Sequence, residues 1–292
     1  MARNSYGLVM FCIMMFLLWA PVCSSAFGAE TITSPLNGKV LELSDTSQEY
    51  SFFVAGHVYG APQSPSVFPS ASFLANVDMI NQNEAKFFIL LGDSIRAANP
   101  VYIENFKPVC SNVEISIFNA VGNHDLTNRE LYESHFGQTY FDFRHGSELF
   151  IVLDGQINNG EIVGKQLEYL KGVLDYANKS EEVKNVFIFS HNLIWSKNNA
   201  HLERTVYPHT NSHANYENID NFKSVVMPEI TRLSQTKKVF MMSGDIGVSW
   251  SLPLFYHKDE KHNITYIACG LGDTEKDAII KVDITRGGRS DI

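Results

Sequence analysis

Three polar residues, Asn123, His124 and Asp125, follow an apolar run that ends at Val121. They offer an amide oxygen, an imidazole and a carboxylate on consecutive positions, which are groups that bind metal ions or transfer protons. A packed core has no use for such a cluster at the end of a strand, whereas a metal site does. Taken alone, these residues and Gly122 also fit an Asx-type turn that holds an unrelated histidine. The choice depends on whether other apolar runs end in the same way.

Four further apolar runs of similar length end at a residue that can bind metal. Residues 51–55 are followed by His57, residues 86–91 by Asp93, residues 186–190 by His191, and residues 238–243 by Asp245. Carboxylate, amide and imidazole groups are the ligands that hard-to-borderline divalent metals take in proteins. The pattern therefore predicts a metal site built from several strand ends. The alternative, that each is a loop residue with local hydrogen bonds, remains open.

Each residue of the predicted site has an expected role. Asp93 follows the central run and is expected to bridge two ions, while Asn123 and His191 are expected to be terminal ligands. His124 is placed to protonate a leaving oxygen, and Asp125 is expected to hold its tautomer. These groups would support hydrolysis by a metal-activated water.

The elements that must position these residues alternate along the chain. Short continuous apolar runs between turn signals are typical of strands that are buried on both faces. Residues 69–83 and 164–177 carry apolar side chains at helical spacing. Alternating strands and helices predict an α/β protein with a mostly parallel sheet. The five runs would then bring their polar residues to the same edge of one sheet.

The order of Gly92-Asp93, Gly122-Asn123-His124-Asp125 and Ser190-His191 resembles the calcineurin-like metallophosphoesterase superfamily. Residues 140–143, 148–154 and 166–170 are similar to that family's central hairpin strand, its following strand and its next helix. The resemblance covers roughly residues 50–273. It implies a four-layer α/β/β/α metallophosphoesterase-like sandwich, in a single domain over residues 30–292. It also implies a dinuclear centre between the strand ends.

The first and last motifs depart from the family pattern. The first strand normally ends in Asp-x-His, where this chain has His57-Val58-Tyr59, and the last motif is normally Gly-His-x-His, where it has Gly244-Asp245-Ile246-Gly247. Carried over by position, one ion would keep Asp93, Asn123, His191 and Asp245. The other would have Asp93 and His57, with Tyr59 as a further candidate, and would lack a histidine at Gly247.

Three interpretations of these departures stay open. The first is a variant hydrolase with a mononuclear or asymmetric site, in which Arg96 contacts the phosphate through its guanidinium fork. The second is a two-metal centre in which Asp and His have exchanged places. The third is a degenerate fold kept for binding, as a cell-surface or glycan-associated protein. The adjacent His124 and Asp125 favour catalysis over the third.

A segment rich in histidine follows His191 and contains His201, His209 and His213. It is either a substrate-binding insertion that supplies the missing ligand, from His209 or His213, or a polar surface loop. Trp195, just before it, is either a wall of the pocket or part of the core.

Composition and the first residues predict where the protein acts. The chain has 292 residues, 45% of them hydrophobic, and a net charge of −9, which is unfavourable for binding nucleic acid. Arg3 precedes an apolar stretch at residues 8–20 and then small residues, so residues 1–29 are predicted to be a secretory signal peptide. An uncleaved anchor is the alternative; the stretch is short for a membrane span.

We therefore expect an exported protein, periplasmic or secreted, with one or two ions of Mn, Fe or Zn. Its expected substrate is a phosphate-ester small molecule or a cell-envelope phosphate. Cys110 and Cys269, the two cysteines beyond the signal segment, allow one disulfide without establishing it.

Overall fold

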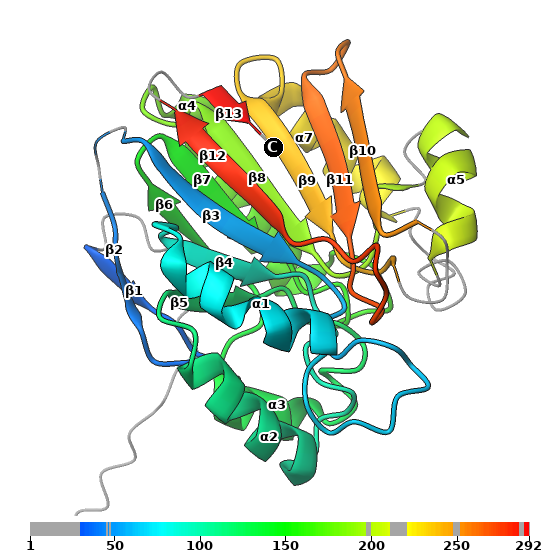
Figure 1. The fold of residues 1–292 in the computed structure, drawn as a ribbon. Coiled ribbons are helices and arrows are strands. Elements are labelled where there is room, and N and C mark those ends of the chain that lie inside the picture. Colours follow the sequence, from blue (N-terminus) through cyan, green and yellow to red (C-terminus); the bar gives the residue numbers. More distant parts are fainter. Residues whose placement is uncertain are drawn as a thin grey trace, which may run out of the picture.

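The computed structural model describes residues 30–44, 46, 48–196, 200–210, 221–247, 252–285 and 289–291. The predicted signal peptide and His213 lie outside the described residues. Two β-sheets face each other in the described part of the chain (Figure 1). A short antiparallel pair, β1 (Thr31–Thr33) and β2 (Val40–Glu42), stands beside them.

The first sheet has five strands in the order β13-β12-β3-β4-β5. Its strands are β3 (Tyr50–Ala55), β4 (Phe87–Leu90), β5 (Ser116–Asn119), β12 (Ile280–Thr285) and β13 (Arg289–Asp291). β3, β4 and β5 run parallel, and β12 pairs antiparallel with β3. The three parallel strands therefore end on the same side of the molecule.

The second sheet has six strands in the order β10-β11-β9-β8-β7-β6. They are β6 (Phe141–His145), β7 (Glu148–Val152), β8 (Asn185–Ser190), β9 (Lys238–Ser243), β10 (Leu254–Asp259) and β11 (Ile264–Cys269). β7, β8, β9 and β11 are parallel, while β6 and β10 are antiparallel edge strands.

The expectation of one sheet edge, made from the apolar runs alone, was wrong. The strands before His57, Asp93 and Asn123 belong to the five-stranded sheet, and those before His191 and Asp245 belong to the six-stranded sheet. The runs could not reveal this because a strand buried against a second sheet and one buried between helices are equally apolar. The four-layer sandwich implied by the family resemblance does contain two sheets.

Phenylalanine rings fill the space between the two sheets. Phe52 stacks on Phe87 within the first sheet with ring centroids 5.0 Å apart, and Phe150 stacks on Phe187 within the second at 5.3 Å. Phe87 and Phe150 meet edge to face across the interface at 5.1 Å. Each buried ring contributes about 1.5–3 kcal/mol through removal from water, with about 0.5–1.5 kcal/mol more for each aromatic pair.

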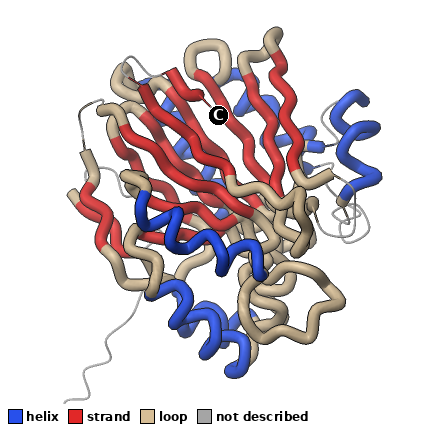
Figure 2. The backbone as a smooth tube through the Cα atoms, in the orientation of Figure 1, coloured by secondary structure: helices blue, strands red, loops and turns tan. Residues whose placement is uncertain are grey.

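Helices cover the outer face of each sheet, which completes the four layers (Figure 2). On the five-stranded sheet lie α1 (Ala71–Gln82), α2 (Pro100–Ser111) and α3 (Arg129–Phe136). On the six-stranded sheet lie α4 (Gly164–Lys179), η3 (Phe222–Val226) and α7 (Met227–Leu233). The short helix α5 (Ala200–Val206) stands beside the β10 edge of that sheet, and η2 (Tyr207–His209) follows it directly (Figure 1). No helix among the described residues is both long enough and apolar enough to cross a membrane.

Side-chain caps start the first three helices at defined residues. Ser70 Oγ accepts a hydrogen bond from the backbone N–H of Phe73, and Asn99 and Asn128 cap α2 and α3 in the same way. Each cap satisfies a backbone donor that has no partner inside the helix and is worth about 1 kcal/mol. The caps stop each helix from running back into the preceding loop, and all three of these loops follow strand ends and carry predicted site residues.

Candidate metal centre

The loops after five parallel strands carry the predicted ligands, and four of these side chains lie close together. Asp93 Oδ1 is 3.4 Å from His191 Nε2, and Asp93 Oδ2 is 3.6 Å from His57 Nε2. His191 Nε2 is 3.9 Å from Asp245 Oδ1. Asn123 follows Gly122 in the chain, and Gly122 packs directly against Asp93. The strand ends of both sheets thus meet at one site.

The backbone is strained at two of these residues. His57 and Asp93 both have a φ of 52°, the left-handed region that non-glycine residues rarely adopt. The conformation is held by hydrogen bonds from His57 N to Gly92 O (3.0 Å) and from Tyr59 N to Asp93 O (2.9 Å). Such strain costs about 1–3 kcal/mol per residue and persists where surrounding contacts fix it, often at functional sites.

His191 presents a bare nitrogen to two carboxylates. Its Nδ1 donates to Leu91 O at 2.8 Å, so the proton of the neutral ring is on Nδ1. Its Nε2 is buried without a hydrogen-bond partner and faces Asp93 and Asp245 at distances too long for hydrogen bonds. Burial lowers the pKa of His191, but the two carboxylates outweigh burial and raise that pKa above its ordinary value. The position beside Nε2 favours a cation.

The donor set at this position fits a divalent metal ion. Two ligands of one ion with bonds of about 2.0–2.1 Å lie about 3.0–3.4 Å apart, close to the Asp93–His191 separation of 3.4 Å. Asn123 Oδ1 is a further buried oxygen without a partner. Within the described residues, no group of three or more His, Cys, Asp and Glu side chains is already arranged to hold an ion. The ligands meet in pairs, and the Asp245 pair would have to close by a fraction of an ångström.

The predicted pair between His124 and Asp125 is not formed. His124 Nδ1 is 2.7 Å from Arg96 O, so this carbonyl fixes the histidine tautomer instead of a carboxylate. His124 Nε2 is 3.3 Å from the Tyr59 hydroxyl and lies on the half-buried side of the loop. Consecutive side chains of a loop turn in different directions, so His124 faces the site while Asp125 faces inward.

Asp125 instead ties the loop after β4 to the loop after β5, beneath the site. Its Oδ1 accepts from the backbone N–H groups of Ser94 (2.8 Å) and Ile95 (3.1 Å). Its Oδ2 accepts from Gly122 N (2.9 Å) and Asn119 Nδ2 (3.1 Å). Full burial is the main reason that the pKa of Asp125 is raised to about 6. The carboxylate is therefore a structural anchor of the Asp93 and Asn123 loops.

Arg96 also differs from its expected role. Its guanidinium donates to Ala61 O at 2.9 Å and Pro62 O at 2.6 Å, and its central carbon lies 4.7 Å from the centre of the Tyr59 ring. The planar fork that was expected to contact phosphate is engaged with two neighbouring carbonyls of the loop. Burial raises the pKa of Tyr59 above its ordinary value, so its phenol is neutral.

The segment after His191 contacts the site through a residue that the sequence did not single out. Thr210 Oγ1 donates to Asp245 Oδ2 at 3.0 Å. Only its position beside His209 hinted at this contact. Trp195 is fully buried and donates from Nε1 to Ser243 Oγ at 2.9 Å, so it belongs to the core. His201 lies against His257, with ring centroids 4.7 Å apart.

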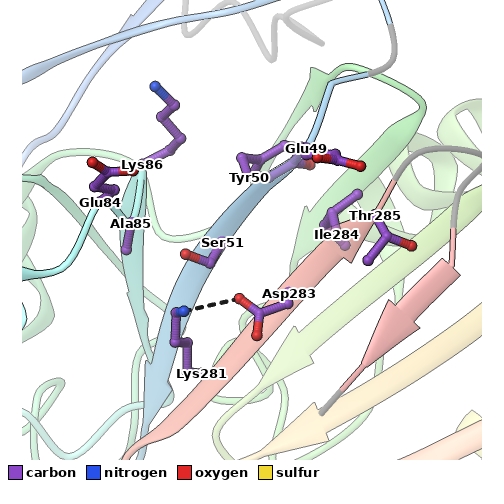
Figure 3. A pocket seen from close by; sticks show the side chains of 10 residues that line it. All are labelled: Glu49, Tyr50, Ser51, Glu84, Ala85, Lys86, Lys281, Asp283, Ile284 and Thr285. Atoms are coloured by element: carbon purple, nitrogen blue, oxygen red, sulfur yellow. Dashed lines mark ion pairs between the residues drawn. The ribbon is translucent and has the colours of Figure 1, made fainter.

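A separate cavity of about 720 Å³ lies at the opposite end of the first sheet (Figure 3). It is lined at the amino ends of β3 and β4 and the carboxyl end of β12, where Lys281 and Asp283 form an ion pair of 3.0 Å. Ligands of α/β proteins bind at the carboxyl ends of parallel strands, where the predicted ligands lie. The cavity is therefore distinct from the candidate metal centre.

Comparisons with known proteins place the fold. No protein-family model matches the chain, and no curated protein sequence matches it. A dimetal phosphatase from Danio rerio aligns with a TM-score of 0.57 at 13% identity, over 80% of this chain and 92% of that chain. GAP50, described as the anchor in the inner membrane complex of Plasmodium, aligns with a TM-score of 0.54 at 13% identity, over 82% of both chains.

The purple acid phosphatase PPD1 from yellow lupin seeds is a third similar structure. It aligns with a TM-score of 0.53 at 12% identity, over 84% of this chain and 52% of that chain. This chain thus spans about half the length of the lupin enzyme. Identities this low show the architecture alone. The chain has the four-layer α/β/β/α fold of metallophosphoesterase-like proteins.

Proposed function

We propose that this protein is an exported, metal-dependent phosphoesterase-like hydrolase that cleaves a phosphate ester with a metal-activated water. One observation carries the proposal: predicted ligands from strands of both sheets converge, and His191 Nε2 is buried there facing two carboxylates without a hydrogen bond. Asp93, Asn123, His191 and Asp245 would hold the ion. A bound divalent ion would polarise a phosphoryl oxygen and lower the pKa of a water molecule.

The chain's own residues would orient the substrate and move a proton. Asp93 receives the His124 backbone N–H on Oδ1 at 3.1 Å, which fixes the distance between the carboxylate and the histidine loop. Because Nδ1 donates to Arg96 O, Nε2 is the nitrogen of His124 that would carry the second proton of the imidazolium and give it to a leaving oxygen. The Tyr59 hydroxyl lies 3.3 Å from His124 Nε2 and helps to orient the imidazole ring.

The test combines metal content with hydrolysis. Protein purified after export should retain at least about one ion of Mn, Fe or Zn per chain and hydrolyse an aryl phosphate ester. Protein that stays metal-free and inactive after each of these ions is supplied would refute the proposal.

The variant His124→Ala separates the proton donor from the ligands. It should lower kcat by about 100-fold or more, the usual contribution of general acid catalysis, with metal content nearly unchanged. Metal should remain because the bond to Asp93 comes from the His124 backbone N–H, which alanine keeps. Loss of metal in this variant would reassign His124 as a ligand. The variant His135→Ala, at an exposed position of α3, is the matched control and should keep full activity.

A non-catalytic binding protein is the second candidate. Two observations favour it: Gly247 supplies no ligand where the family pattern has histidine, and a protein described as an anchor, GAP50, shares the fold. A protein of this kind, including a cell-surface or glycan-associated one, would show no hydrolysis with any metal. Loss of hydrolysis in the His124→Ala variant would exclude it.

A further inference from the structure

The Asp93 carboxylate divides the candidate centre into two sides. Oδ1 faces His191 Nε2 at 3.4 Å, and Asp245 lies on this side as well. Oδ2 faces His57 Nε2 at 3.6 Å on the other side. A carboxylate with one oxygen toward each side is able to bridge two ions. Whether it does so depends on the remaining ligands of each side.

The His191 side has enough ligands for an ion. Two carboxylates, Asp93 and Asp245, and one imidazole, His191, are all at least 98% buried. Asn123 has a buried amide oxygen without a partner, and the residues on either side of it, Gly122 and His124, both contact Asp93 Oδ1, the oxygen that faces His191. Protein sites for such ions use three or four protein ligands. Two carboxylate charges also balance the charge of one divalent ion.

The His57 side has too few. Apart from Asp93, its described donors are His57 and Tyr59, whose rings pack against each other with centroids 4.3 Å apart. The Tyr59 hydroxyl is within 3.3 Å of His124 Nε2, so it already has a partner. One imidazole and one shared carboxylate would have to hold a second ion.

The backbone prevents a further ligand at the turn after Asp245. Gly247 has a φ of 92°, and a Cβ atom there would collide with the backbone of Gly270. No side chain fits at this position without moving both loops. The histidine that the family pattern has here is therefore excluded by packing as well as by sequence.

The charges near the His57 side also disfavour a second ion. The guanidinium of Arg96 lies against the ring of Tyr59, one of the donors of the His57 side, at 4.7 Å from the ring centre. Among the residues that the structure describes, that side adds no carboxylate beyond the Asp93 oxygen. A second divalent ion would meet a nearby cation without a matching anion, which is unfavourable at a buried site.

We infer that this protein binds a single divalent cation on the His191 side of Asp93 and that the His57 side binds no second ion. The inference rests on the proposed function, which requires a metal, and goes beyond it by fixing the number and the side. It separates this chain from a two-metal enzyme whose ligands have merely exchanged places.

Metal stoichiometry tests the inference without relying on activity. Protein stripped with a chelator is dialysed to equilibrium against excess Mn²⁺, and bound manganese is measured by mass spectrometry. We expect about one ion per chain and the hyperfine EPR pattern of isolated Mn²⁺. Two ions per chain, with the broadened spectrum of an exchange-coupled pair, would overturn the inference and leave the proposed function standing. No bound ion and no hydrolysis would overturn both.

Two variants assign the side. His191→Ala should lose the bound ion, whereas His57→Ala should keep about one ion per chain. A reduced count in His57→Ala, or a full count in His191→Ala, would contradict the assignment. Circular dichroism and thermal unfolding of each variant without metal show whether the fold is intact, so that a lost ion is not confused with a lost fold.

Discussion

At the scale of single residues, the centre combines ligands with anchors that sequence alone does not distinguish. His124 and Asp125 are adjacent, yet one faces the site and the other accepts four hydrogen bonds beneath it. The anchor restricts where the loops of Asp93 and Asn123 can lie. Loss of activity in a variant of Asp125 would therefore report a displaced loop rather than a missing catalytic group.

Replacing Asp125 with alanine should destabilise the protein by about 3–5 kcal/mol, because four buried donors lose their acceptor. Urea unfolding of metal-free protein measures the change. Asp175→Ala is the matched control: its ion pair with Lys179 is exposed on α4, so the expected change is within about 0.5 kcal/mol. Equal effects of the two variants would show that Asp125 is not an anchor.

At the scale of elements, the parallel strands position the ligands only because their loops pack without side chains between them. Gly122 is one such point, since a Cβ atom there would collide with the backbone nitrogen and the carboxylate of Asp93. The close approach lets the loop after β5 bring Asn123 beside Asp93.

Gly122→Ala should therefore push Asp93 out of place and weaken metal binding by at least about tenfold, with a loss of stability of about 1–3 kcal/mol. Titration with Mn²⁺ and urea unfolding measure both effects. Gly172→Ala is the control because Gly172 is exposed on the outer side of α4, with nothing within 4 Å of an added Cβ. That change should raise stability by about 0.5–1 kcal/mol. Unchanged metal affinity in Gly122→Ala would contradict the packing argument.

The contact between β6 and α4 makes stability depend on pH. Asp142 is buried with Oδ1 accepting from the Tyr169 hydroxyl at 2.7 Å, while Oδ2 has no partner. Burial raises the pKa of Asp142 to about 6, from 3.8. The folded state binds the proton of Asp142 more tightly than the unfolded state does. This preference stabilises the fold fully below about pH 4, and the stabilisation is lost as the pH rises to about 6.

Asp142→Asn cannot ionise, so it should not lose this stabilisation. Its stability relative to the natural protein should increase by about 2–3 kcal/mol between pH 4 and pH 7. Urea unfolding of both proteins at pH 4 and pH 7 gives the free energies of unfolding. Any effect of the new amide that does not depend on pH cancels when the two pH values are compared. Parallel pH profiles for the two proteins would refute the predicted ionisation of Asp142.

At the scale of the whole molecule, the reactivity of two buried cysteines in the described chain shows whether the hydrophobic cores open to solvent. Cys110 and Cys269 are free and buried, in the helix-side core of the first sheet and in the core between the sheets. Burial raises the pKa of Cys269 to about 12 and that of Cys110 further still. Both thiols are thus withheld from reaction in the native state.

Reductant should leave the thermal midpoint unchanged, and a thiol reagent should label both cysteines no faster than the protein unfolds. Mass spectrometry of labelled protein follows the reaction. Fast labelling of either cysteine under native conditions would show local opening of its core, and a midpoint lowered by reductant would show a disulfide.

Much of the architecture could be predicted from local sequence. The apolar run at residues 238–243 coincides with β9, and the runs before His57 and His191 match β3 and β8 within one residue, because glycine and polar residues bound them. The two sheets could not be separated, since the strands that lead to the site are buried on both faces in either sheet. The partners of Arg96, and the contact of Thr210 with Asp245, depend on loops that meet only in the folded chain.

The division of the ligands between two sheets has a mechanical consequence. Asp93 and Asn123 belong to one sheet, and His191 and Asp245 to the other, so an ion held by all four would be a cross-link between them. At the far end the sheets are joined by the Tyr50 hydroxyl, which donates to Glu148. Removing the ion would leave the end that carries the loops held by hydrogen bonds such as those from His191 Nδ1 to Leu91 O and from Leu271 N to Gly56 O. We expect the two sheets to separate more readily at this end, so that amide hydrogen exchange rises at the strand ends beside the site.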